Sequence, residues 1–366
     1  MICRRVTYRN FRNIEEAVLT PDREVTVLNG KNGEGKTNTL EGIFLFAGGR
    51  SFRTQKEQEL VRFGCDFAEI TLEYFDGKRE NRATLRFVPK YAKRFCVRNG
   101  VTLTKLSEMM GHFRAVLFCP EHLSIVKDGP AVRRRFLDTA LSQTDTEYLR
   151  SLQVYNALLN QRNASIKMAR ERHDDRLFLD TAELWSEQLS TEGERISQKR
   201  AAYLTKLSEE VGVVLSDMTG GREKPTLIYQ GLKTKEELFK LLTENTEREL
   251  RFGSTLYGTH KDDILLSLNG KEARAFASQG QQRSLALAMK IAEGELSFKS
   301  TGEAPVFLFD DILSELDSSR RDFLLAGLKG RQVIITSCDE IKTPCRVFYV
   351  SKGRLSFSDK ERPTQV

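Results

Sequence analysis

The chain has 366 residues, of which 39% are hydrophobic and 30% charged, a composition typical of globular proteins rather than of disordered or membrane chains. No apolar run approaches the roughly 20 residues that cross a bilayer, so we expect a cytoplasmic protein without a membrane partner. The net charge of +7 and the pI near 9.0 favour a polyanionic partner such as nucleic acid, and the six cysteines, which form no C-x-x-C pair, argue against a zinc site.

The first 90 residues predict strands and a single helix. The helix directly follows an apolar strand, carries Leu40, Ile43 and Phe44 on one face, and is expected to end at Gly48–Gly49. Strands are expected where the composition or the alternation is of the β type, at 2–8, 25–28, 68–74 and 83–88.

From about residue 132 the pattern becomes helical. One apolar stripe begins at Leu149, and a second runs from Phe178 to Leu215 at spacings of three and four. The second stripe predicts an arm of about 55 Å, since each helical residue rises about 1.5 Å. Two such helices, joined by the charged stretch 167–176, favour an antiparallel hairpin. The turn Gly220–Gly221 is expected to close this lobe.

The last third returns to mixed helices and strands. A helix is expected after Ser278 and another near 322–328, and strands are expected at 264–268, 306–309, 332–336, 347–351 and 354–357. A chain of this length exceeds the usual size of a single core, so two lobes are expected. We place an ATPase lobe at 1–116 and 250–366, and a helical lobe at 117–249.

A phosphate-binding pattern, G-x-x-x-x-G-K-[ST], follows the strand at 25–28. Glycines in such a loop let backbone amides converge on phosphate oxygens, while the lysine reaches the β and γ phosphates and the threonine hydroxyl binds Mg²⁺. The sequence therefore predicts ATP and Mg²⁺ as cofactors, with a nucleotide site formed by Gly30, Lys31, Asn32, Gly33, Glu34, Gly35, Lys36, Thr37 and Asn38.

Two aspartates end the buried strand at 306–309. Asp310 is expected to approach the Mg²⁺ of a nucleotide bound at a neighbouring strand's loop. Asp311 occupies the position at which ABC-type ATPases usually carry a glutamate that orients the attacking water. Because aspartate is one methylene shorter, we expect slow hydrolysis, with Lys36, Asp311 and Ser278 as catalytic residues.

The stretch Ser278-Gln279-Gly280-Gln281-Gln282 begins a helical pattern. By itself it fits a helix cap, with Ser278 and Gln281 three residues apart. Between a phosphate-binding loop and an acidic strand it instead resembles the ABC signature, in which Ser278, Gly280 and Gln281 meet the γ-phosphate held by a second subunit. The stretch 314–317 likewise matches the ABC D-loop, or else a capping turn.

The order of these motifs resembles that of ABC-type ATPases and predicts an α/β fold, an SMC-like head with an inserted, mainly helical lobe. In that class ATP lies between two heads, so we expect an ATP-dependent homodimer. Seven stretches together resemble the RecF family of bacterial recombination and gap-repair proteins: 11–13, 49–54, 118–123, 133–138, 258–263, 278–283 and 310–317.

The resemblance implies an ATP-dependent clamp with a weak, DNA-stimulated ATPase, which binds duplex DNA and single/double-strand junctions and helps to load recombinase with RecO and RecR. Two departures from the family pattern stand out. The family's Gly-Pro-His-Arg-Asp-Asp stretch has Thr259 and Lys261 here, and the ABC switch histidine is replaced within Ser337-Cys338-Asp339.

Two basic clusters are candidates for DNA contacts. The first lies at a helix start and comprises Arg133, Arg134 and Arg135, and the second lies near the hairpin tip and comprises Lys167, Arg170, Arg172 and Arg176. Either could be a solvated charged face, and phosphate neutralisation needs only clustered positive charge.

Two rival functions stay open on the sequence. An ABC transporter subunit would share the motifs, but the interval of about 240 residues between Thr37 and Ser278 holds a helical arm that transporter heads of this class generally lack. A DNA-binding protein that uses ATP only to hold its dimer together is the other, and the short side chain of Asp311 is compatible with it.

Overall fold

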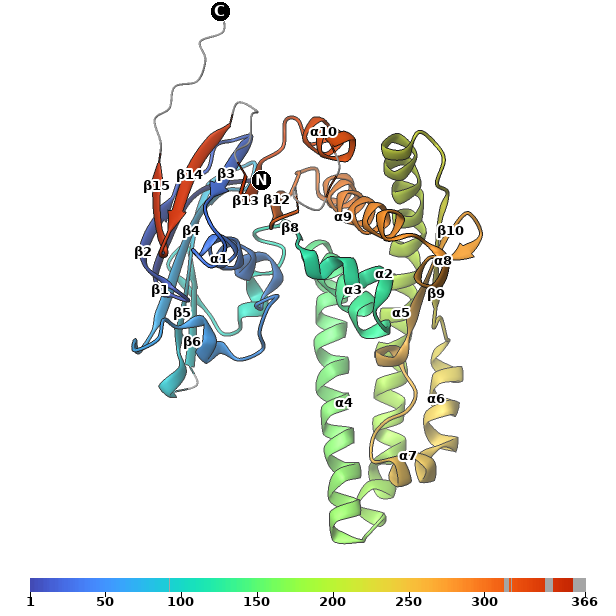
Figure 1. Cartoon of the computed structure of the whole chain (residues 1–366). Coiled ribbons are helices and arrows are strands. Elements are labelled where there is room, and N and C mark those ends of the chain that lie inside the picture. Colours follow the sequence, from blue (N-terminus) through green and yellow to red (C-terminus); the bar gives the residue numbers. More distant parts are fainter. Residues whose placement is uncertain (92, 313–315, 317, 340–344, 358–366) are drawn as a thin grey trace, which may run out of the picture. The chain divides into compact units, whose positions relative to one another are not determined.

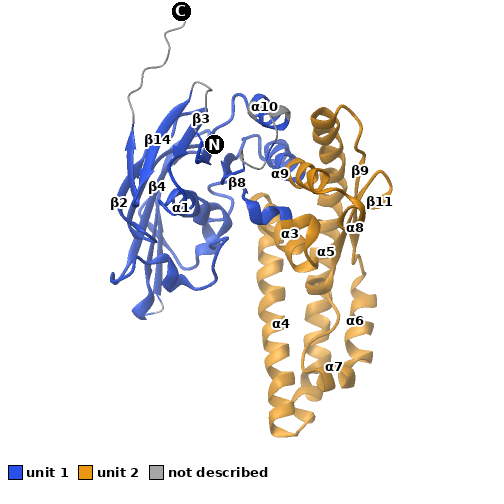
Figure 2. Ribbon diagram, viewed as in Figure 1, with its two compact units in different colours: residues 1–123, 289–366 blue, residues 124–288 orange. Residues whose placement is uncertain are grey.

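The computed structural model describes residues 1–91, 93–312, 316, 318–339 and 345–357. The chain forms two compact units, Met1–Leu123 with Met289–Val366 and Ser124–Ala288 (Figure 2). The second boundary lies after the predicted 249/250. Strand β9 (Pro225–Gln230) pairs with β10 (Asp263–Leu268) along its whole length, which ties the residues beyond 250 to the helical unit.

The first unit contains an antiparallel sheet in the order β2-β1-β4-β5-β6-β7 (Figure 1). Its strands are β1 (Ile2–Phe11), β2 (Ile14–Leu19), β4 (Ala68–Phe75), β5 (Glu80–Val88), β6 (Lys93–Arg98) and β7 (Val101–Leu103). Along β5, exposed and buried residues alternate, as expected for a sheet with one face on the core. The strands predicted at 2–8, 68–74 and 83–88 are confirmed.

The second sheet of this unit has the order β15-β14-β3-β13-β12-β8. All neighbouring strands are parallel except the terminal hairpin β14–β15. The strands are β3 (Val25–Asn29), β8 (Ala115–Phe118), β12 (Val306–Phe309), β13 (Val333–Ser337), β14 (Arg346–Ser351) and β15 (Arg354–Phe357). Strands β8 and β12 are buried at every residue, which explains their unbroken apolar sequences.

Helix α1 (Lys36–Gly48) packs in the core that both sheets share, with Leu40, Ile43 and Phe46 fully buried. It ends as predicted, since Gly49 has a φ of 65° and its N–H donates to the carbonyl of Leu45. The unit also contains α10 (Ser318–Gly327) and four short 3-10 helices at Glu57–Leu60, Pro89–Tyr91, Leu106–Met109 and Pro120–Leu123.

The second unit is mainly helical. Helices α4 (Thr146–Arg172) and α5 (Arg176–Thr219) form the predicted antiparallel hairpin (Figure 1). The 44 residues of α5 span about 66 Å, longer than predicted because the helix begins at Arg176 and continues to Thr219, beyond both ends of the apolar stripe. A Cβ at Gly193 would lie 2.6 Å from Leu238, so the glycine lets α6 (Lys235–Glu244) pack closely. Helix α5 ends before Gly220, at the predicted turn, although the helical unit continues beyond it to Ala288.

The remaining helices of this unit are α2 (Ser124–Lys127), α3 (Pro130–Thr144), α6 (Lys235–Glu244), α7 (Thr246–Phe252) and α8 (Ala273–Phe276), with a 3-10 turn at Thr259–Lys261. Strand β11 (Lys271–Glu272) extends the β9–β10 pair. Helix α9 (Gln279–Thr301) contains the boundary between the two units. Among the described residues, no helix combines the length and apolarity that crossing a membrane requires.

The family-like stretch Gly258–Asp263 lies in a buried polar network of the second unit. Arg200, which is 2% exposed, donates to the carbonyl of Thr259 at 2.8 Å and to Asp138 at 2.7 Å. Its guanidinium also lies 3.8 Å from Asp262. A buried charge is tolerated only when it is paired in this way. The stretch therefore has a structural role that joins β10 to the arm.

Candidate nucleotide site

The predicted nucleotide residues follow three adjacent strands of the parallel sheet. The phosphate-binding loop follows β3, Cys338 follows β13, and Asp310 follows β12, with β13 in the middle. Because the carboxyl ends of parallel strands meet at one edge, the three segments converge there. The sequence separates Thr37 from Asp310 widely, and the sheet order brings them together.

The loop itself depends on its glycines. Gly33 and Gly35 have φ values of 82° and 114°, in the left-handed region that glycine adopts without a steric penalty. A Cβ at Gly30 would lie 2.3 Å from the carbonyl oxygen of Val350, so any larger residue would push the loop off β14. Gly35 caps α1, whose first-turn amides and dipole favour an anion.

Lys36 is buried, and its ammonium group lies inside the loop. The Nζ donates to the carbonyl oxygens of Gly30 at 2.5 Å and Lys31 at 3.1 Å, and to Cys338 Sγ at 3.2 Å. The Cys338 thiol donates in turn to Asn32 Oδ1 at 3.0 Å. A cysteine thus takes the place at which the sequence lacks a switch histidine, and it contacts the loop lysine directly.

Thr37 and Asp310 meet as predicted. The Thr37 hydroxyl donates to Asp310 Oδ1 at 2.9 Å, and the Thr336 hydroxyl donates to the same oxygen at 2.8 Å. Burial raises the pKa of Asp310, and the nearby carboxylates of Glu121 and Asp311 raise this pKa further. The cluster is therefore an acidic position at which a positive charge would be stabilising.

Asp311 directly follows Asp310 and lines the pocket. Its backbone has a φ of 50°, and its N–H donates to the Thr336 hydroxyl at 2.8 Å. A left-handed backbone costs a residue other than glycine on the order of 1 kcal/mol, and strain of this kind clusters at functional sites. The predicted D-loop, 314–317, lies outside the described residues except for its residue 316.

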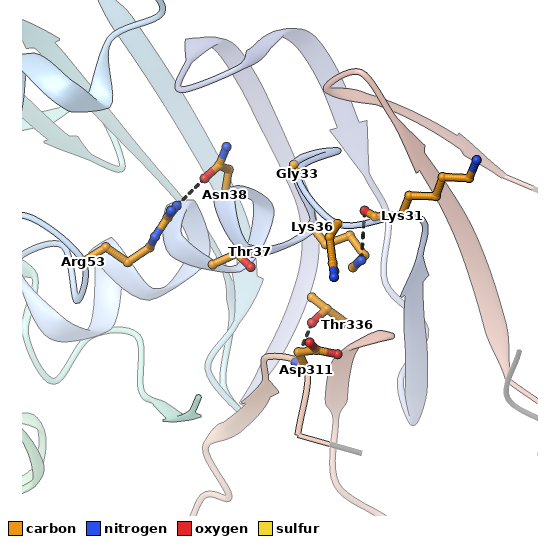
Figure 3. A pocket seen from close by; sticks show the side chains of 10 residues that line it. Lys31, Gly33, Lys36, Thr37, Asn38, Arg53, Asp311 and Thr336 are labelled. Carbon is orange, nitrogen blue, oxygen red and sulfur yellow. Dashed lines mark hydrogen bonds between the residues drawn. The ribbon is translucent and has the colours of Figure 1, made fainter. Parts of the chain in front are cut away.

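The pocket in the first unit has a volume of about 210 Å³. It is lined by Lys31, Asn32, Gly33, Gly35, Lys36, Thr37, Asn38, Arg53, Asp311 and Thr336. All of these except Asn32 and Gly35 are labelled in Figure 3. Gly30 and Glu34, although predicted, are not among the lining residues. Glu34 accepts a hydrogen bond from the backbone N–H of Lys352 instead.

Sequence reasoning missed Arg53 and Thr336. Arg53 Nη1 donates to Asn38 Oδ1 at 2.6 Å, and Figure 3 shows the two side chains together. The only signal for Arg53 in the sequence was its place in the stretch 49–54, which resembles the RecF family. Thr336 gave none, because a threonine within a buried strand is ordinary β composition.

Ser278, Gly280 and Gln281 lie in the second unit at the start of α9. The Ser278 N–H donates to Gln281 Oε1 at 2.9 Å, and the Gln281 N–H donates to Ser278 Oγ at 3.3 Å. This reciprocal pair is a capping box, so the simpler interpretation of the stretch is confirmed. Ser278 is also exposed, which leaves the predicted contact with a second subunit as a prediction.

The first basic cluster, at the start of α3, divides into buried and exposed members. Arg133 is 5% exposed and forms a two-bond ion pair with Asp263, at 2.6 and 2.9 Å. This contradicts the predicted DNA contact at Arg133, because its guanidinium is committed to neighbours in its own unit. Arg134 is half-buried and donates to the carbonyl of Asp262, whereas Arg135 is exposed.

The second basic cluster is exposed at the end of the arm. The Lys167 side chain is 75% exposed and pairs with Glu171 at 3.6 Å, one helical turn away. Arg170 and Arg172 lie in the last turn of α4, where a positive charge also favours the helix dipole. Together with the exposed Arg176, these residues stay candidates for phosphate contacts.

Comparison with known proteins identifies the family of the chain. The RecF/RecN/SMC N-terminal domain family matches residues 2–345. The chain is 36% identical over 359 residues to the DNA replication and repair protein RecF of Clostridium acetobutylicum, covering 95% of this chain and 97% of that one. The protein of the same name from Agathobacter rectalis is 37% identical over 370 residues, covering 98% and 100%.

Solved structures support the same relationship. The recombination mediator protein RecF-ATP in the RecFOR pathway matches with a TM-score of 0.89 at 32% identity and covers 97% of each chain. The Smc head domain of Pyrococcus furiosus bound to the C-terminal domain of ScpA matches with a TM-score of 0.56 at 17% identity, covering 97% of this chain and 95% of that one, which shows a shared fold. The chain therefore belongs to the RecF family of DNA replication and repair proteins.

Proposed function

We propose that this protein is an ATP-dependent DNA clamp in which ATP binding drives dimerisation on DNA and slow hydrolysis permits release. The pocket carries this proposal, because it combines a phosphate-binding loop, the buried cation of Lys36 and the carboxylate of Asp311, while Asp310 accepts a hydrogen bond from Thr37 beside it. The solved RecF-ATP structure supports ATP as the ligand, and the SMC-like head fold supports ATP hydrolysis in general.

The oxygen atoms of Thr37 and Asp310 fit a Mg²⁺ ion. Two ligands at right angles around Mg²⁺, each with a bond of about 2.1 Å, lie about 3.0 Å apart. The Thr37 Oγ1 to Asp310 Oδ1 distance is 2.9 Å. When bound, the ion would neutralise charge on the β and γ phosphates. Thr336 would hold the Asp310 carboxylate in the same orientation through its hydroxyl.

Asp311 would orient the attacking water, while Lys36 would stabilise the charge on the transferred phosphoryl group. The exposed start of α9 would complete the site of a second copy, with Ser278 at that copy's γ-phosphate. Each ATP would then be covered by two chains. A closed dimer with basic surfaces could retain DNA until hydrolysis separates the heads.

DNA, including single/double-strand junctions, and the proteins RecO and RecR are the partners proposed from family membership. The RecFOR pathway named for the solved relatives supports this assignment. Family membership also favours a role in recombinase loading over the transporter alternative, because the RecF relatives match this chain over nearly its full length.

An ATPase assay with and without duplex DNA, combined with light scattering, tests the proposal. We expect slow turnover that duplex DNA increases, and a dimer that forms with ATP. ATP-dependent dimers without any turnover would favour the alternative in which ATP only holds the dimer together. If the protein neither binds ATP nor dimerises with it, the clamp is refuted.

We expect Asp311→Asn to bind ATP and dimerise normally while hydrolysing it at least about a hundredfold more slowly, the loss typical of a missing general base. Asparagine tolerates the left-handed backbone of this position, so the fold should persist. Turnover and dimer lifetime on DNA are the measurements, with the exposed Asp66→Asn as a control. Unchanged turnover would remove Asp311 from the water-orienting role.

Replacing Lys167, Arg170 and Arg172 together with alanine should weaken DNA binding in a salt-dependent way. If all three contact phosphates, the slope of log K against log salt should fall by about 2.7. The matched control replaces three exposed lysines elsewhere in the second unit, Lys206, Lys224 and Lys240. Equal slopes for both triple variants would place the DNA contact away from the arm tip.

A further inference from the structure

Two hairpin turns hold the outer side of the phosphate-binding loop. Asn13, in the turn between β1 and β2, donates through Nδ2 to the carbonyls of Gly33 at 3.4 Å and Glu34 at 3.2 Å. From the turn between β14 and β15, the Gly353 N–H donates to the same Glu34 carbonyl at 2.8 Å. We call Gly33 and Glu34 the crest of the loop. Their carbonyls are therefore hydrogen-bonded on the side of the loop that faces these turns.

These hydrogen bonds determine where the N–H groups of the following residues, Glu34 and Gly35, point. In a planar trans peptide, the carbonyl and the N–H of the following residue point in opposite directions. Holding the Gly33 and Glu34 carbonyls against the turns thus directs the N–H groups of Glu34 and Gly35 away from them. Successive amides that point the same way form an anion-binding nest.

The packing around Asn13 leaves little room for another arrangement. A Cβ on Gly35 would lie 2.8 Å from Asn13 Oδ1, and a Cβ on Gly353 would lie 2.3 Å from the Asn13 carbonyl oxygen. Both glycines also have left-handed φ values, 114° and 74°. The loop and the two turns therefore pack with backbone against backbone, and Asn13 is the side chain between them.

Asn13 also connects the crest to the wall of the pocket. Its Oδ1 accepts from Asn38 Nδ2 at 2.8 Å, and Asn38 Oδ1 accepts from Arg53 at 2.6 Å. Both Asn38 and Arg53 line the pocket, whereas Asn13 does not. One side chain behind the loop thus fixes the crest carbonyls with its amide nitrogen and the wall with its oxygen.

We propose that Asn13 is a positioning residue for the nucleotide site, which turns the crest amides toward the phosphates and orients Arg53 through Asn38. This inference rests on the proposed function of the pocket as an ATP site. Asn13 acts through the loop and touches no reacting atom, so its loss should weaken ATP binding without slowing the chemical step.

Asn13→Ala in the full-length protein should weaken Mg²⁺-ATP binding about tenfold, as the loss of a side chain that donates to two loop carbonyls would. In steady-state kinetics the KM for ATP should rise while kcat stays within about twofold, because uniform binding is lost rather than transition-state binding. The matched control is Asn10→Gly in the same hairpin, whose φ of 51° suits glycine. A lowered kcat at unchanged KM would overturn the proposal.

The connection through Asn38 is tested by a double-mutant cycle. If Asn13 acts through Asn38, the pair Asn13→Ala and Asn38→Ala should lose less affinity than the sum of the single losses. Asn13→Asp keeps an acceptor for Asn38 but places a carboxylate oxygen against the carbonyls of Gly33 and Glu34, so it should lose at least as much affinity as Asn13→Ala. It also provides a folded variant if alanine destabilises the turn. Additive losses in the cycle would refute the connection.

The two proposals fail in different ways. If wild-type protein does not bind Mg²⁺-ATP in the titration, the proposed function is wrong. If the wild-type protein binds Mg²⁺-ATP and both Asn13→Ala and Asn13→Asp bind it as tightly as the wild type, the ATP site stands and the positioning role of Asn13 is refuted.

Discussion

Lys36→Ala is expected to abolish measurable ATP binding and, with it, ATP-dependent DNA retention. The Lys36 ammonium is buried among loop carbonyls and is the charge that would meet the phosphates. Losing two charge-assisted hydrogen bonds, at roughly 2 kcal/mol each, weakens binding about a thousandfold. Titration of nucleotide onto the purified variant measures the loss directly.

The control for this variant is Lys56→Ala, an exposed lysine in the same unit. Thermal unfolding should be recorded for both proteins, because Lys36 also binds two carbonyls of the loop in this structure. Salt-sensitive DNA binding by the basic surfaces should persist without nucleotide. Near-normal ATP affinity with normal DNA retention would remove the phosphate-binding loop from the mechanism.

Ser278→Arg is expected to bind ATP in its own loop yet fail to dimerise. Ser278 is exposed and directly precedes the 23-residue helix α9, so a bulky cation there would displace the helix start from a partner's γ-phosphate. ATP-dependent DNA binding should weaken, and a residual affinity should depend steeply on salt. Light scattering with a non-hydrolysable ATP analogue decides the outcome.

The capping box supplies a competing expectation for Ser278. If the serine only caps α9, its loss should lower stability by about 1 kcal/mol and leave the dimer intact. Ser300→Arg, an exposed position near the other end of the same helix, is the matched control. A dimer of normal stability in the Ser278 variant would refute the two-chain site.

Local signals predicted the parts of this protein that depend on neighbouring residues. The loop glycines and Lys36 fall at fixed spacings after an apolar strand, and strand β12 was predicted with its observed bounds. Helix α5 was recognised from its apolar stripe, because one face of it must be buried. Its full length was not predicted, because its ends at Arg176 and Thr219 lie beyond that stripe.

The tertiary structure decided which distant side chains share the site and which charges remain exposed. Thr336, Arg53 and Asn13 reach the loop only because the sheet order and two hairpin turns bring them to it, and no spacing in the sequence encodes those distances. Arg133 shows the same limit, because it lies beside Arg134 and Arg135 in the sequence, yet the fold buries it against Asp263. A sequence determines local periodicity and the chemistry available, whereas burial and pairing depend on contacts between residues that are far apart along the chain.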